Sequence, residues 1–82
     1  MNQITVLFFA TMRDHTGVKR ITLELPEGST LADLKALIGE KYPRAQGALQ
    51  ATLASINREF AVDEDVIPDG AEVAFFPQVS GG

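Results

Sequence analysis

The extreme C-terminus carries the residues with the clearest chemical use, because the chain ends in Val79-Ser80-Gly81-Gly82. Glycine has no Cβ, so two terminal glycines allow the backbone to enter a narrow channel where a side chain would collide. The carboxylate of Gly82 is a poor electrophile, but transfer of AMP from ATP makes it a mixed anhydride. A sulfur donor that attacks this anhydride leaves a thiocarboxylate on Gly82.

The other residue types that could do chemistry give no further site. The chain has no cysteine, which excludes disulfides, thiolate metal sites and thiol nucleophiles. His15 is the single histidine and lies in a polar stretch, and Asp63-Glu64-Asp65 lacks the glycine and the distant glutamate of a calcium loop. No phosphate loop or paired-carboxylate site stands out either. We therefore expect no catalytic side chain, no metal and no bound cofactor.

Composition limits the partners and the compartment. The 82 residues are 45% hydrophobic and 22% charged, which is typical of one globular domain. The formal net charge of −4 argues against nucleic acid or an anionic membrane as partner, and favours a basic protein surface. No apolar run approaches the roughly 20 residues that span a bilayer, and no signal-peptide pattern opens the chain. We expect a cytoplasmic protein.

The first half of the chain predicts two strands and a helix. Residues 4–10 form a dense apolar run suited to a central strand, residues 20–25 alternate like a half-buried strand, and residues 11–19 are expected to be a hairpin connection. Thr30 and Asp33 approximate a capping box that starts a helix. The apolar stripe of this helix consists of Leu31, Leu34, Leu37 and Ile38, and Pro43 ends it.

The second half predicts shorter elements. Residues 44–50 fit a loop or a short helix, and the sequence does not decide between them. Two short strands at residues 53–57 and 60–62 flank a polar turn at Arg58-Glu59, and a last strand at 72–76 follows the turn Pro68-Asp69-Gly70.

This order of elements predicts an α+β fold of the β-grasp (ubiquitin-like) type. One main helix covering one face of a mixed sheet is the economical way to bury that face. We place the domain at residues 1–76 and a flexible tail at residues 77–82, where no periodicity remains. Fully extended at roughly 3.3–3.6 Å per residue, the tail reaches on the order of 20 Å, which is enough to enter another protein's active site.

The two Phe-Phe pairs predict a docking surface. Neighbouring strand residues point to opposite faces, so one member of each pair lies on the less apolar face. Phe9 and Phe76 are the members expected to be exposed, and Phe60 extends their patch. Arg13 and Arg58 are expected at its rim. The alternative, that all five phenylalanines are buried, stays open from the sequence.

Three segments together resemble a known family: Val6-Leu7-Phe8-Phe9-Ala10, the run from Asp69 to Pro77, and Val79-Ser80-Gly81-Gly82. They are similar to the MoaD/ThiS family of ubiquitin-like sulfur carriers, and within it to the small subunits of molybdopterin synthase. The resemblance covers essentially the whole chain and is loose between residues 44 and 53. Gln78 departs from it, because the family pattern has a second proline there that stiffens the tail.

The resemblance implies a function that depends on two partner proteins. A MoeB-like adenylyltransferase of the ubiquitin-activating type would use ATP to adenylate Gly82, which is then converted to a thiocarboxylate. The tail would next enter the MoaE-like large subunit of molybdopterin synthase and give dithiolene sulfur to a pterin precursor. The catalytic residues would belong to these partners, so the chain itself is expected to be a non-catalytic carrier.

Other functions remain open. A ThiS-like carrier would hand sulfur to thiazole synthesis or to tRNA thiolation, although Phe75-Phe76-Pro77 favours the molybdopterin branch. A ubiquitin-like modifier would instead form an isopeptide bond through Gly82. A plain interaction module would have an inert tail.

Overall fold

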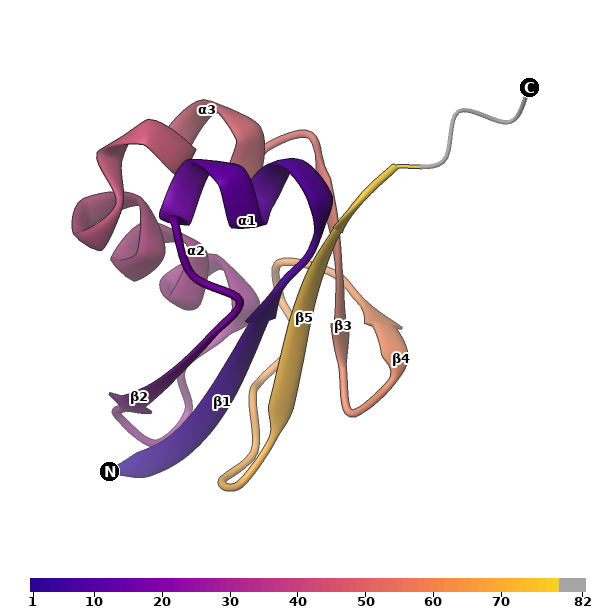
Figure 1. Ribbon diagram of the computed structural model, residues 1–82. Coiled ribbons are helices and arrows are strands. Elements are labelled where there is room, and N and C mark those ends of the chain that lie inside the picture. Colours follow the sequence, from indigo (N-terminus) through magenta and orange to yellow (C-terminus); the bar gives the residue numbers. More distant parts are fainter. Residues whose placement is uncertain (79–82) are drawn as a thin grey trace.

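A five-stranded mixed sheet with helices on one face makes up residues 1–78, the part of the chain that this computed structural model describes (Figure 1). The strands lie in the spatial order β2-β1-β5-β3-β4, and only β1 and β5 run parallel. In chain order they are β1 (Asn2–Phe8), β2 (Arg20–Leu25), β3 (Thr52–Ile56), β4 (Glu59–Ala61) and β5 (Glu72–Pro77). The helices are α1 (Ala10–Thr16), α2 (Leu31–Lys41), the 3₁₀ helix η1 (Pro43–Ala45) and α3 (Gln46–Leu49).

The core lies between the sheet and the helices. Alternate residues of the two central strands point into it, and the apolar stripe of α2 packs against them. The largest fully buried side chains are Ile4, Val6, Phe8, Met12, Leu31, Leu34, Ile38, Ile67, Val73 and Phe75. The opposite face of the sheet is left without helices, so no helix covers its side chains (Figure 1).

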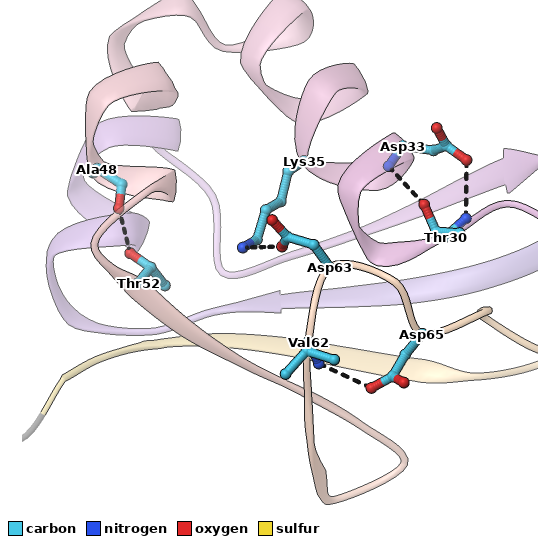
Figure 2. A network of polar contacts seen from close by, with 8 residues as sticks. All are labelled: Thr30, Asp33, Lys35, Ala48, Thr52, Val62, Asp63 and Asp65. Atoms are coloured by element: carbon cyan, nitrogen blue, oxygen red, sulfur yellow. Dashed lines mark hydrogen bonds and ion pairs between the residues drawn. The ribbon is translucent and has the colours of Figure 1, made fainter.

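Helix α2 begins at the predicted capping box. The backbone N–H of Asp33 donates to the Thr30 hydroxyl oxygen at 3.3 Å, and the Thr30 N–H donates to the Asp33 carboxylate at 3.0 Å (Figure 2). Both bonds satisfy N–H groups that have no partner inside the helix. The helix ends at Lys41, shortly before Pro43, as predicted.

We expect Thr30→Ala to lower the free energy of unfolding by about 1 kcal/mol, because it removes the hydroxyl acceptor of the capping box. Urea denaturation followed by circular dichroism measures the change. Thr30→Ser keeps the acceptor and should stay close to the parent protein. Equal midpoints for the Ala and Ser variants would contradict a stabilising role for this cap.

The acidic stretch after β4, residues 63–65, contacts the first turns of α2. The Lys35 ammonium pairs with the Asp63 carboxylate at 2.7 Å, and the Asp65 carboxylate accepts the Val62 N–H at 2.9 Å (Figure 2). The carbonyl oxygens of Asp65 and Asp63 accept the N–H groups of the first two residues of α2, at 2.9 and 3.0 Å. Residues 63–65 therefore support the start of the helix.

The segment at residues 11–19 connects the antiparallel strands β1 and β2, as predicted, but it contains the helix α1, which was not predicted. The chain leaves the strand after Phe8, and Ala10 turns it into the helix with a φ of 52°. Met12 and Thr16 are buried one turn apart, and Gly17 ends the helix with a φ of 77°. Two buried residues among seven are too few to show a helical periodicity in the sequence. A helix of this length is stabilised mainly by its packing against the rest of the domain.

Further boundaries differ from the prediction, beginning with the first strand, which spans Asn2–Phe8 and not residues 4–10. The β3–β4 turn consists of Asn57 and Arg58, both with positive φ, and Glu59 already belongs to β4. The segment at residues 44–50, left undecided by the sequence, is mostly helical, because η1 and α3 together span residues 43–49. The last strand includes Pro77, which lies opposite Thr52 at the end of the ladder, so pairing stops one residue later than predicted.

Candidate functional site

The helix-free face of the sheet gathers apolar side chains at one end. Because side chains alternate along β5, Ala74 and Phe76 point to this face while Val73 and Phe75 are buried. The strand register brings further apolar residues beside them. We define the open-face patch as Leu7, Leu53, Phe60, Ala74 and Phe76, whose neighbours in register are Leu53 with Phe76 and Leu7 with Ala74.

Two aromatic rings form the centre of this patch. The Phe60 and Phe76 ring centroids lie 5.9 Å apart at an interplanar angle of 52°, which is within the range of favourable aromatic pairs. Phe60 is 80% exposed, and Phe76 is half-buried. A single exposed apolar side chain is ordinary, but Phe60 and its apolar neighbours form a contiguous patch, which indicates a protein-docking surface.

Phe9 lies at the same end of the sheet. It is 47% exposed, it keeps an extended backbone at φ −118° and ψ 151°, and its N–H donates to the carbonyl oxygen of Phe75 at 3.1 Å. Continued alternation from Leu7 turns Phe9 to the helix-free side. The predicted exposure of Phe9 and Phe60 thus agrees with the structure, and Phe76 is partly covered by Phe60.

The last strand carries the chain past this patch. β5 ends at Pro77, one residue beyond Phe76, and only Gln78 follows it in the described part of the chain (Figure 1). The predicted tail residues Val79, Ser80, Gly81 and Gly82 lie outside the described residues. A partner that binds the open-face patch is therefore held next to the point from which those residues continue.

The two arginines predicted at the rim are both exposed, and they lie on different elements. Arg13 lies on α1, and Arg58 is the second residue of the β3–β4 turn. Neither forms an ion pair with another residue between 1 and 78. Their contribution to binding stays a prediction.

Arg58 holds a φ of 71°, a region that costs a non-glycine residue free energy. An Asn-Gly pair is the preferred pair for this two-residue turn. We expect Arg58→Gly to raise the free energy of unfolding by about 0.5–1 kcal/mol in urea denaturation. Arg58→Ala keeps the unfavourable backbone and serves as control. A Gly variant no more stable than the Ala variant would show that the turn is not strained.

Leu7 and Leu53 belong to the patch, although the sequence analysis did not select them as site residues. Leu7 could have been found, because it alternates with Phe9 on the first strand. Leu53 could not, because its place opposite Phe76 depends on the register between β3 and β5, which no local pattern specifies.

Residues 1–78 contain no group of three or more histidine and carboxylate side chains arranged to hold a metal ion. His15 lies half-exposed on α1. No helix in the described part of the chain is long and apolar enough to cross a membrane. The surface with the clearest potential for recognition in this range is therefore the open-face patch.

Comparison with known proteins gives consistent matches over nearly the whole chain. The ThiS family model matches residues 6–82. The chain is 37% identical over 82 residues to the molybdopterin synthase sulfur carrier subunit of Chlamydomonas reinhardtii, covering 98% of this chain and 99% of that protein.

Two solved structures share the fold. The small archaeal modifier protein SAMP1 of Haloferax volcanii superposes with a TM-score of 0.87 at 20% identity, covering 99% of this chain and 100% of that one. A chain from the complex of subunits 1 and 2 of the Helicobacter pylori molybdopterin-converting factor gives 0.71 at 20% identity, covering 98% and 99%. These likenesses confirm the predicted ubiquitin-like β-grasp fold.

Proposed function

This chain belongs to the ThiS family, and we propose that it is the sulfur-carrier subunit of a molybdopterin synthase. The relative from Chlamydomonas reinhardtii, which aligns along nearly its full length, carries that name. The observation that carries the proposal is the combination of a Gly-Gly terminus with an exposed aromatic patch beside the strand that leads to it.

The proposed chemistry takes place at the carboxylate of Gly82. A carboxylate oxygen attacks the α-phosphorus of ATP, pyrophosphate leaves, and an acyl-adenylate forms. Hydrosulfide then attacks the acyl carbon, the C–O bond to AMP breaks and AMP leaves, and loss of the S–H proton to solvent gives Gly82 a thiocarboxylate. The chain contributes the electrophile, and the activating enzyme contributes the ATP site and the catalytic side chains.

The proposed partners are an adenylyltransferase of the ubiquitin-activating type and the large subunit of molybdopterin synthase. Both must bind the same terminus, so both are expected to use the open-face patch, and therefore to bind one after the other. A patch of aromatic and aliphatic side chains matches the apolar core of a protein interface. The proposed compartment is the cytoplasm, where ATP is available for the first step.

The test is intact mass spectrometry of the protein after incubation with ATP, sulfide and the adenylyltransferase. We expect a mass increase equal to the replacement of one oxygen by sulfur, located at Gly82 by fragmentation. An unchanged mass, with the enzyme shown to be active on a known carrier, would contradict the proposal. A branched peptide linked through Gly82 in cell extract would instead identify a protein modifier.

A further inference from the structure

β2 forms one edge of the sheet and presents an unpaired side. It is hydrogen-bonded to β1 alone among the described strands, and it lies at the opposite end of the strand order from β4 (Figure 1). Its six residues pair with β1 without an interruption in register. The strand contains no proline and no bulge, two devices with which proteins block edge-to-edge pairing.

The register shows which backbone groups point outward. The Phe8 N–H donates to the carbonyl oxygen of Lys19 at 2.9 Å, and Leu7 lies opposite Arg20. Hydrogen-bonded and non-hydrogen-bonded pairs alternate along an antiparallel ladder. The β2 residues whose backbone groups hydrogen-bond to β1 are therefore Ile21, Leu23 and Leu25. The N–H and C=O groups of Arg20, Thr22 and Glu24 point away from the sheet.

We propose that two copies of this chain associate through β2, as antiparallel strands related by a two-fold axis at Thr22. In this register Arg20 lies opposite the partner's Glu24, and Glu24 lies opposite the partner's Arg20. All three outward-pointing residues then occupy hydrogen-bonding positions. Opposite charges directly across a strand pair are favourable, so the edge is complementary to itself in charge as well as in hydrogen bonding.

The other side of β2 supports the same register. Ile21 and Leu23 are half-buried at the edge of the core, on the helix-covered side. Pairing places Ile21 opposite the partner's Leu23, so that each copy covers the exposed part of the other's side chain. A contact of one strand with a few side chains is smaller than the roughly 1,200–2,000 Å² of stable complexes, so the association is weak and depends on concentration.

This association goes beyond the proposed sulfur-carrier function. Phe60 lies on β4 and Leu53 on β3, at the far side of the strand order from β2. Two paired copies would therefore keep both open-face patches accessible.

Sedimentation equilibrium from about 10 µM to about 1 mM protein tests the proposal, because weak association falls in this range. We expect the average mass to rise toward twice that of one chain. Arg20→Glu and Glu24→Arg each place like charges opposite one another at two positions and should weaken association at least tenfold. The double variant Arg20→Glu/Glu24→Arg exchanges the charges and should restore it. The mass of one chain at every concentration, or a double variant that fails to recover, would overturn the proposal.

Cysteine cross-linking tests the register directly, because the chain has no cysteine of its own. Thr22→Cys places two thiols across the proposed axis, with Cα atoms about 5.5 Å apart, which is within the range of a disulfide. We expect oxidised glutathione to convert this variant to a covalent dimer. Thr5→Cys, on the neighbouring strand opposite Thr22, is the matched control and should remain a single chain. Equal cross-linking of the two variants would exclude a specific edge contact.

Discussion

A chain that ends at Ser80 is expected to receive no sulfur from an active adenylyltransferase, ATP and sulfide. Removal of Gly81 and Gly82 leaves a carboxylate, but that carboxylate stops about 7 Å short of the position of the native one, since an extended residue spans roughly 3.3–3.6 Å. The adenylation step requires the carboxylate at the phosphorus atom. Mass spectrometry of the truncated chain should therefore show no thiocarboxylate.

The controls separate a lost terminus from a damaged domain. Circular dichroism should give the same unfolding midpoint for the truncated and full-length chains, because the deletion removes no residue from the described domain. Gly47→Ala changes a different glycine, one where an added Cβ meets no atom within 4 Å, and it should accept sulfur normally. Sulfur transfer by the truncated chain would show that the carrier hypothesis is wrong.

Phe75→Ala is expected to lower the free energy of unfolding by about 3–5 kcal/mol, the usual cost of removing a buried phenylalanine ring. Phe75 has no exposed surface, and its ring stacks on that of Phe8 with centroids 6.1 Å apart. Because small domains are stable by only about 5–15 kcal/mol, this single change removes much of the total. A shift of the urea midpoint to lower concentration measures the loss.

Phe60→Ala is the matched control, because we expect it to have a comparatively small effect on the free energy of unfolding and a large effect on partner binding. Phe60 is 80% exposed and its main packing partner is the Phe76 ring, so its removal should lower the free energy of unfolding by about 0.5–1.5 kcal/mol, well below the loss for Phe75→Ala. It should weaken binding to the large synthase subunit at least tenfold, about 1.4 kcal/mol, in isothermal titration calorimetry. Unchanged binding by Phe60→Ala would show that the partner docks elsewhere, and an unchanged midpoint for Phe75→Ala would contradict the assigned core.

Part of the candidate site could be predicted because strand alternation is a local rule. It distinguished Phe9 from Phe8 and Phe76 from Phe75, and the structure places Phe8 and Phe75 in the core. The approach of Phe60 to Phe76 was proposed from the sequence only as a possible extension of the patch. Phe60 lies near Phe76 because β4 pairs with β3 and β3 pairs with β5, and the registers of both pairings place the two side chains close together.

The sequence by itself determined the features that depend on residues close together in the chain. The capping box joins residues three positions apart, β2 shows a strict two-residue period, and the Gly-Gly terminus is a covalent fact. Only the tertiary structure decided the helical state of residues 10–16, the position of Leu53 beside Phe76 and the outward backbone groups of β2. Each of these depends on contacts with distant segments, because a seven-residue helix is too short to be stable alone and a strand register is fixed only by its partner strand.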